Sequence, residues 1–317
     1  MAAFRSGGGV IEVSPIADEA EEQLSLDLYN AVWPQDEYTL AEVHSFKAGL
    51  VDHVDLLVHV AGEAAGSGLA LIGPNRPELV FAVVTVLPGL RHRGAGTGLY
   101  EAISRWTREH GLDEIEVPVL DDDPESLAFA KRRGFVEDRR EKGVVLHLAE
   151  IEAPPVDPPE GVEILTWAER PELARGIYEV ALEASPDVPG YEDERAEPFE
   201  DWLAHDMQRS GKEPEATFVA VAGDEVVGYA QFTLKAAQPT RAHHHMTGVK
   251  RAWRERGVAG ALKAAQIGWA KANGYEELHT RNDERNAPIR HLNKEFGYRP
   301  AVGRIYLKGP ALSGRDS

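Results

Sequence analysis

Three consecutive histidines, His243, His244 and His245, are the residues of this chain best suited to moving protons near neutral pH. A free imidazole titrates near about 6.5, so a histidine can take a proton from an amine under ordinary conditions. Alternation along a strand would place His243 and His245 on one face and His244 on the other. The same run could bind a metal ion, although no third ligand is evident, or form a merely polar sheet face. We predict a general base at His243 and His245, with those alternatives open.

A glycine-rich turn follows the histidines, at residues 254–260, and a similar turn lies at residues 91–98. Each opens a predicted helix. A turn without side chains exposes successive backbone N–H groups, and the helix adds partial positive charge at its N-terminus, so the two together can hold a phosphate or pyrophosphate. The lysine and hydroxyl residue of a P-loop are missing, and a dinucleotide-binding turn would come earlier in an alternating fold. A plain helix-entry turn without a ligand remains the alternative, although two copies with the same flanking residues favour it less.

Both turns belong to one long repeat, because residues 86–135 reappear 163 positions later without a gap. The period exceeds the roughly 50 residues of solenoid repeats, so the chain contains two copies of one domain. The matched pairs include Val86 and Val249, Arg91 and Arg254, Gly94 and Gly257, Trp106 and Trp269, and Gly134 and Gly297.

The elements that position these residues follow the same order in both halves. Strands are predicted near residues 10–13, 56–60, 69–71 and 80–87, then a helix at 95–109, a strand at 114–119, a short helix and a last strand near 144–148. The second half repeats this pattern, ending with a strand near 305–307, and has helical stretches at 170–184 and 199–208. The fold class is therefore mixed α/β, with one strand–helix–strand crossover in each half. Four prolines within residues 154–159 form a stiff connector, which predicts domains at residues 1–152 and 160–317.

Composition limits the function classes. The chain of 317 residues has no cysteine, so disulfides, thiolate metal sites and a cysteine nucleophile are excluded. Its formal charge of −19 repels nucleic acid and attracts a cationic amine. No apolar run is long enough to cross a membrane. Residues 1–9 resemble a frayed end rather than a signal peptide, and we expect a cytoplasmic protein, as a monomer or homodimer, with neither a nucleic-acid nor a membrane partner.

The glycine turns and the segments after them resemble the GCN5-related N-acetyltransferases, the GNAT superfamily. The acetyl-CoA signature of that family, Arg/Gln-x-x-Gly-x-Gly/Ala, is similar to the sequence from Arg91 to Gly96 and from Arg254 to Ala259. Its second motif, an Asn followed by a short helix and Gly-Phe or Gly-Tyr, resembles Asn286 through Tyr298 and, with Asp for Asn, Asp123 through Phe135. The resemblance covers nearly the whole chain as two tandem domains.

The resemblance implies acetyl-CoA as cosubstrate, with no metal. The backbone of the strand that ends at Val249 would pair with pantetheine and polarise the thioester carbonyl. The implied cofactor-binding residues of the second copy are Thr247, Val249, Arg254, Arg256, Gly257, Val258, Ala259, Gly260 and Asn286. Those of the first copy are Val86, Arg91, Arg93, Gly94, Ala95, Gly96 and Gly98.

The resemblance also implies unequal domains. One member of the family carries a His-x-His pair at the same distance before the signature arginine, and that pair is assigned to proton removal through water. The first copy has Val80 and Ala82 at the positions of His243 and His245, so we predict that the second domain is the catalyst. The tyrosine that often protonates the leaving thiolate is replaced by Asn293 and, in the first copy, by Ala130.

The leading hypothesis is an N-acetyltransferase that moves acetyl from acetyl-CoA directly to a primary amine of a small substrate. One rival is a non-catalytic acyl-CoA-binding or scaffold protein. Another has both domains active on different amines. The acceptor cannot be read from the residues.

Overall fold

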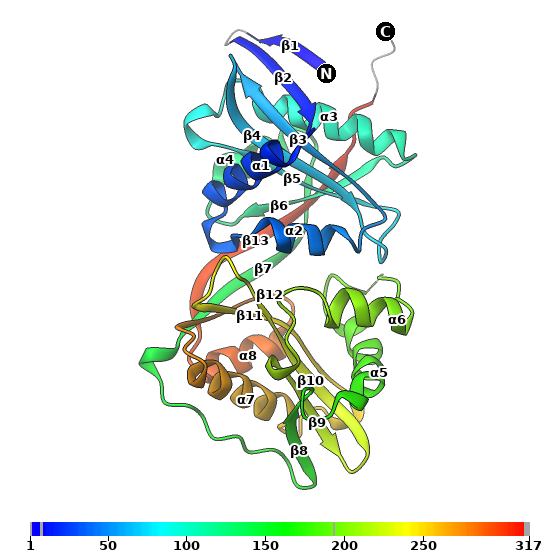
Figure 1. The fold of residues 1–317 in the computed structure, drawn as a ribbon, viewed down its shortest axis with the longest axis vertical. Coiled ribbons are helices and arrows are strands. Elements are labelled where there is room, and N and C mark those ends of the chain that lie inside the picture. The colour runs from blue at the N-terminus through cyan, green and yellow to red at the C-terminus, as the bar shows by residue number, and fades with distance from the viewer. Residues whose placement is uncertain (1, 7–8, 193, 314–317) are drawn as a thin grey trace. The chain divides into compact units, whose positions relative to one another are not determined.

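The computed structural model describes residues 2–6, 9–192 and 194–313, and the chain forms two compact units. Unit 1 contains Met1–Arg139 and Arg304–Ser317, and unit 2 contains Arg140–Gly303. Figure 1 labels the helices and strands of each unit. We describe each unit by itself.

Unit 1 is a mixed sheet covered by helices on both faces. Its sheet runs in the order β1-β2-β3-β4-β5-β6-β13, with neighbours antiparallel except for the parallel pair β5 and β6. The strands are β1 (Ala2–Ser6), β2 (Gly9–Pro15), β3 (Asp52–Val60), β4 (Glu63–Ile72), β5 (Val80–Val86), β6 (Glu114–Leu120) and the second part of β13 (Arg299–Pro310). The helices are α1 (Glu19–Val32), α2 (Leu40–Lys47), α3 (Ala95–Glu109) and α4 (Pro124–Lys131). Thus Ala2–Ser6 pair with β2, where the sequence predicted a frayed end.

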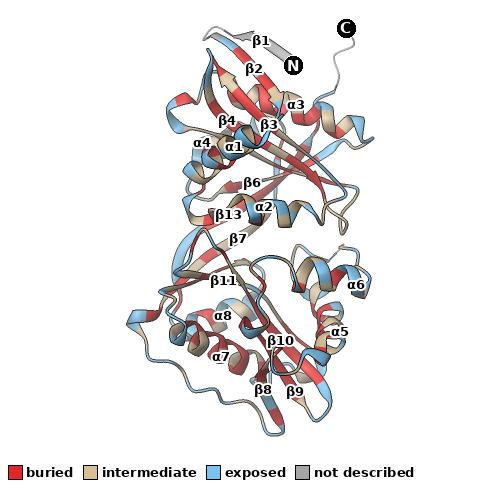
Figure 2. Ribbon diagram, viewed as in Figure 1, coloured by how far each residue is buried: buried red, intermediate tan, exposed pale blue. Residues whose placement is uncertain are grey.

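Neighbouring residues of β4 show how the two faces of this sheet are covered. The hydroxyl of Ser67 donates to the backbone of Ser25 in α1, whereas Gly68 lies against Leu99 of α3. Successive strand residues point to opposite faces, so α1 and α3 lie on opposite sides of β4. The apolar side chains between the sheet and α3 are buried (Figure 2) and form one core that includes Leu99, Ile103 and Ile115.

Unit 2 repeats this plan. Its sheet runs in the order β7-β12-β11-β10-β9-β8, with β11 and β12 parallel and the other neighbours antiparallel. The strands are β8 (Val162–Thr166), β9 (Thr217–Ala222), β10 (Glu225–Leu234), β11 (Arg241–Val249), β12 (Glu277–Asp283) and the part of β7 (Val136–His147) that follows Arg139. The helices are α5 (Ala174–Ala184), α6 (Phe199–Trp202), α7 (Val258–Ala272) and α8 (Ala287–Glu295), and a π-helical turn η6 (Leu203–Met207) extends α6.

The repeat found in the sequence recurs in the element bounds. Helices α3 and α7 start at Ala95 and Val258 and end at Glu109 and Ala272, and β6 and β12 start at Glu114 and Glu277. Each of these pairs is 163 residues apart, as is the pair β7 and β13. The mixed α/β class and the tandem organisation predicted from the sequence are confirmed.

The last strand of each half belongs to the sheet of the other unit. Residues Arg304–Pro310 of β13 pair with β6 in unit 1, and residues 141–147 of β7 pair with β12 in unit 2. Their apolar side chains follow them: Ile305 and Leu307 join the core of unit 1, and Leu146 joins Ile267 and Tyr298 in the core of unit 2. The division predicted at residues 152 and 160 separates the two copies of the repeat. The structural units differ from these copies because the last strand of each copy belongs to the other unit. The Pro-rich connector between the copies forms neither helix nor strand, as expected.

Candidate active site

The two glycine turns adopt the same backbone conformation. Gly94 and Gly257 precede α3 and α7 with φ of 95° and 91°, a left-handed geometry that favours glycine. The turn residues His92 and Glu255 are left-handed as well, with φ of 63° and 58°. Within the described residues no side chain caps either helix, so the first amides of α3 and α7 can meet an anion. Adding a Cβ at Gly257 would meet no atom within 4 Å, which leaves room above the turn.

The signature arginines shape these turns rather than standing free beside them. Arg254 donates from Nε to the carbonyl of Val249 at 3.0 Å, and Arg91 donates to the carbonyl of Val86 at 3.5 Å. The outer nitrogens of each guanidinium pair with carboxylates: Arg254 with Asp187 at 2.8 Å, and Arg91 with Asp123 at 3.0 Å. Each arginine side chain therefore connects the end of the preceding strand with the glycine turn. The exposed Arg256 stacks over the ring of Trp253.

The strand before each turn separates from its parallel neighbour. Pairing between β11 and β12 covers Arg241 to His243, and pairing between β5 and β6 covers only Val80 and Phe81. Beyond these pairs, Thr247 and Val249 continue to pair with β10 on the other side. The backbone of β11 that faces the separation can therefore add an extended ligand as if it were a further strand.

The three histidines of β11 have three different environments. His243 Nε2 lies 2.7 Å from Gln238 Oε1, and its ring centre lies 5.4 Å from that of His279 on β12. His245 Nε2 lies 2.8 Å from Asp206 Oδ1 on the π-helical turn. His244 instead faces α7, where Nδ1 lies 3.0 Å from Gln266 Oε1 and Nε2 lies 2.5 Å from the Tyr298 hydroxyl. His244 and His245 thus lie on opposite faces, as alternation predicts.

Burial and charge set the electrostatics of His245. Protein surrounds the ring densely, yet 34% of its side-chain surface remains accessible. Burial lowers the pKa of His245, and the charge of Lys212 lowers it further, while Asp206 opposes both. Burial would raise the pKa of Asp206, but His245 and Lys212 together hold it well below its usual range. His245 is therefore predominantly neutral, and Asp206 is ionised, near pH 7.

The other face of β11 carries a buried polar cluster around His244. Lys263 of α7 is 1% exposed, and its ammonium lies 4.9 Å from the centre of the Tyr298 ring. Burial lowers the pKa of Lys263 to about 7, and burial with the nearby Lys263 charge lowers that of His244 well below its usual range. His244 has its ring nitrogens engaged and is held neutral, so it is a packed core histidine.

The second motif is built into helix α8 and its counterpart α4. Asn286 caps α8 by accepting from the amide of Ile289, and Asp123 caps α4 by accepting from that of Ser126. Asn293 is 2% exposed and donates to Asn282 of β12 at 2.7 Å. Its Oδ1 has no hydrogen-bond partner in the part of the chain that the structure describes.

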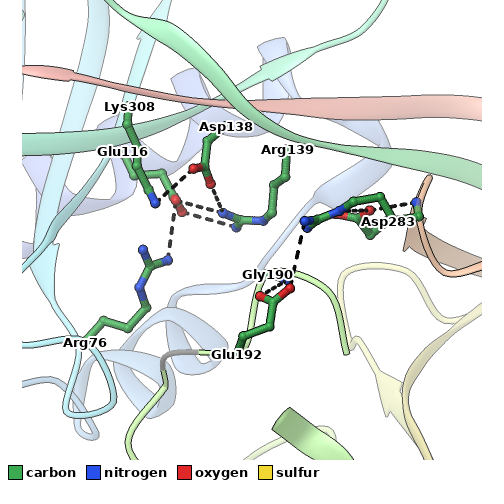
Figure 3. A network of polar contacts seen from close by, with 9 residues as sticks. Arg76, Glu116, Asp138, Arg139, Gly190, Glu192, Asp283 and Lys308 are labelled. Carbon is green, nitrogen blue, oxygen red and sulfur yellow. Dashed lines mark hydrogen bonds and ion pairs between the residues drawn. The ribbon is translucent and has the colours of Figure 1, made fainter. Parts of the chain in front are cut away.

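Unit 1 has a different set of side chains at the corresponding positions. Val80 and Ala82 are completely buried and apolar. Glu116, which stands where unit 2 has His279, is 2% exposed and accepts from Arg139 at 2.7 and 3.2 Å and from Arg76 at 3.4 Å (Figure 3). The Arg139 guanidinium also lies over the Tyr306 ring. These ion pairs engage Glu116 at the last paired position of β5 and β6 in unit 1.

A second polar group in Figure 3 belongs to unit 2. Arg285 forms two hydrogen bonds with Asp283, at 2.9 and 3.0 Å, and an ion pair with Glu192 at 3.8 Å. Glu192 accepts the amide hydrogen of Gly190 at 2.6 Å. The segment after α5 is therefore held to the end of β12 by Arg285 and to the glycine turn by Asp187.

Sequence reasoning missed Asp206, His279 and Lys263. His279 could have been found from the repeat, because it aligns with Glu116 and lies on the strand parallel to β11. The sequence gives no comparable indication for Asp206, since only the fold brings this residue to His245. Among the described residues, no group of three or more histidine, aspartate or glutamate side chains is arranged to hold a metal ion, and no helix is long and apolar enough to cross a membrane.

Two separating parallel strands followed by a glycine turn and a helix, present twice, define a tandem acetyltransferase fold. The model of the acetyltransferase (GNAT) family matches residues 19–135 and 174–298. The chain belongs to this family.

Solved structures and one curated relative support this assignment. A GCN5-related N-acetyltransferase from Sphaerobacter thermophilus has a TM-score of 0.75 and 23% identity, with coverage of 97% of this chain and 98% of that one. A tandem GNAT protein from the clavulanic acid biosynthesis pathway has a TM-score of 0.73 and 20% identity, with coverage of 96% and 100%. L-2,4-diaminobutyric acid acetyltransferase of Nocardia farcinica is 33% identical over 84 residues, which are 25% of this chain and 44% of that relative. The chain thus spans less than half of that relative's length.

Proposed function

We propose that this protein transfers the acetyl group of acetyl-CoA to a primary amine of a small molecule, and that unit 2 is the catalyst. The observation that carries the proposal is the placement of a neutral, accessible imidazole, that of His245, on the strand that separates from its parallel neighbour and leads into the glycine turn. Unit 1 has buried Ala82 at the corresponding position.

The residues of unit 2 fit acetyl-CoA. The uncapped first turn of α7, from Gly257 to Gly260, supplies amides for the pyrophosphate. The backbone of Thr247 to Val249 can pair with the pantetheine arm and donate to the thioester carbonyl. When bound, acetyl-CoA supplies the acetyl thioester. Residues of the chain bind and orient it and move the proton. Arg254 fixes the turn through Val249, Asn286 caps α8, and Asn293 fixes α8 to β12.

The histidines contribute base catalysis to the proposed reaction. An ammonium group cannot attack a carbonyl, so the acceptor must lose a proton, directly or through water, before or during attack. His245 is neutral near pH 7 and can accept it. His243 is the second candidate, with its Nε2 engaged by Gln238 and its ring beside His279.

The acceptor class is supported by charge and by the curated relative. A chain with a formal charge of −19 attracts cationic amines. The relative from Nocardia farcinica is named for an amino acid with a side-chain amine. We therefore propose a small diamine or diamino acid as acceptor.

The proposal is tested by measuring coenzyme A thiol release from acetyl-CoA with a panel of amines that includes 2,4-diaminobutyrate. We expect turnover with at least one amine and a loss of about tenfold or more in kcat for the double variant His243→Ala, His245→Ala. His291→Ala serves as the control, because His291 lies on the surface of α8 with 74% of its side chain exposed.

The possible outcomes separate the alternatives. Unchanged turnover in the double variant would overturn the assignment of the base but leave the acetyltransferase activity standing. Calorimetric titration that shows tight acetyl-CoA binding, with no thiol release for any amine, would overturn the activity itself and favour an acyl-CoA-binding protein.

A further inference from the structure

The turn that carries Asp206 is an irregular one. Helix α6 covers only Phe199–Trp202 and continues as a π-helical turn over Leu203–Met207. A π-turn inserts one residue into the helical repeat and changes which side chains face the neighbouring sheet, and such turns are frequent at functional sites. Here the turn directs Asp206 and Met207 at the same part of unit 2.

That part is a bulge between β10 and β11. The register runs from Ala230 opposite Thr247 to Phe232 opposite His244, so Gln231 lies opposite two residues, His245 and Met246. A bulge redirects a side chain at the cost of local pairing. His245 is therefore a residue whose orientation depends on contacts from outside the sheet.

The π-turn supplies those contacts on both sides of the bulge. Asp206 accepts from His245 of β11 at 2.8 Å. Gln231 of β10 lies with its amide nitrogen 3.3 Å from the sulfur of Met207, and its carbonyl oxygen accepts from the buried ammonium of Lys212 at 3.1 Å. Lys212 is 4% exposed. Two consecutive residues of one turn thus anchor the two strands of the bulge.

We propose that Asp206 is the positioning residue of the catalytic base, holding His245 in one tautomer and one orientation toward the acceptor amine; this inference rests on the proposed acetyltransferase function. A carboxylate only accepts hydrogen bonds, so Nε2 of His245 carries the hydrogen that Asp206 receives. The lone pair on Nδ1 is then free to act as the base.

The proton balance follows from this tautomer. His245 first passes the ammonium proton of the acceptor to water. The neutral amine then gives a second proton to Nδ1 as its nitrogen bonds to the acyl carbon, and the sulfur of coenzyme A leaves as a thiolate with the electron pair of the broken C–S bond. The imidazolium so formed keeps Nε2–H on the carboxylate of Asp206, whose negative charge stabilises it. His245 later releases the proton to water.

Several charged groups besides Asp206 act on His245. Lys212 and Arg209 follow the π-turn, and both disfavour the imidazolium. Tyr229 of β10 is buried, and burial raises the pKa of its phenol well above its usual range, so it stays neutral. Burial lowers the pKa of Lys212 well below its usual range, and Asp206 opposes that shift. Asp206 is thus the group that favours the charged form of both His245 and Lys212, and its neutralisation should lower the pKa of His245 further.

The experiment compares Asp206→Asn with the intact protein and with Asp201→Asn, which removes the same charge from an exposed side chain of α6. We expect Asp206→Asn to lower kcat about tenfold or more and to move the acid limb of the pH–kcat profile to lower pH. His245→Ala should add little further loss in the Asp206→Asn background, because the two residues act as a unit. Asp201→Asn should leave profile and rate unchanged.

A second measurement does not depend on activity. Nitrogen NMR of histidine-labelled protein reports the tautomer and titration midpoint of His245, assigned by its loss in His245→Ala. We expect protonated Nε2 in the intact protein, and a lower midpoint or mixed tautomers in Asp206→Asn. If the intact protein shows Nδ1–H, or if the Asp206→Asn variant keeps both the tautomer and the pH profile, the inference is overturned. If no amine is acetylated but the tautomer depends on Asp206, the proposed function fails while the positioning role of Asp206 stands.

Discussion

Gly309 offers a direct test of the strand exchange. It lies in the part of β13 that pairs with β6, opposite Ile115. A Cβ added there would lie 2.4 Å from Cγ of Phe135 and 2.6 Å from both Cδ atoms of that ring. Phe135 comes from the first copy of the repeat and Gly309 from the second. If β13 stayed with its own half, Gly309 would instead face Tyr298, the residue that corresponds to Phe135.

The geometry sets the size of the effect of Gly309→Ala. Ordinary contacts begin near 3.4 Å, so the ring has to retreat by about 1 Å, and overpacking of this kind costs about 1–3 kcal/mol. Phe135 is 5% exposed and packs edge-on against Tyr100 with ring centres 5.7 Å apart, so it has little space to move. Gly309 is not among the residues with positive φ, and the loss of stability therefore reports the contact rather than backbone strain.

The assay is a double-mutant cycle followed by thermal or urea unfolding. Phe135→Leu should relieve the contact, so the double variant with Gly309→Ala should lose less than the sum of the two single losses, by about 0.5–3 kcal/mol. Tyr298→Leu, in the core of unit 2, should add to Gly309→Ala within about 0.5 kcal/mol. Gly268→Ala in α7, where a Cβ meets no atom within 4 Å, is the control that should not destabilise. Additivity with Phe135 together with coupling to Tyr298 would refute the exchange.

Two further predictions concern the glycine turns and the buried lysine. Gly257→Ala and Gly94→Ala should each destabilise by about 1–2 kcal/mol because of their positive φ, but only Gly257→Ala should lower kcat/KM for acetyl-CoA; an equal loss in Gly94→Ala would show that unit 1 takes part in the reaction. Lys263→Met should raise the melting temperature most at pH 7 and below. The folded state lowers the pKa of Lys263 from 10.5 to about 7, so unfolding takes up a proton between these two pH values and the cost of burying the ammonium is largest below them. The gain should shrink as the pH rises toward 10, and a gain independent of pH would contradict the burial of a titrating amine.

The parts of the fold that follow from the repeat were predictable from the sequence. The repeat at an interval of 163 predicted matching helices, and α3 and α7 start and end at matching residues. The partner of the last strand was not predictable, because an apolar segment near the end of each half indicates a strand but does not say which sheet it joins. The repeat pairs Leu146 with Gly309, where a side chain would meet the ring of Phe135, and this difference becomes visible only once the packing is known.

The sequence predicted the site residues that lie on β11, but not the residues that helical segments bring next to them. Alternation placed His244 and His245 on opposite faces, and a helix begins directly after each glycine turn as the sequence predicted. Asp206 could not be found this way. The sequence of residues 199–208 predicts one regular helix, whereas the structure has a π-helical turn at Leu203–Met207 that brings Asp206 to His245.

The exchange of strands changes how the contribution of each half can be measured. A fragment ending at residue 152 would lack the part of β13 that covers β6, and would retain β7 without its partner β12. It would expose the edge of its sheet and the apolar side chains that Ile305 and Leu307 cover, which favours aggregation. Inactivity of such fragments would therefore report lost folding rather than lost chemistry. The question of one catalyst or two is better answered in the intact chain, by comparing substitutions at Gly94 and Gly257 that alter one turn and leave both sheets complete.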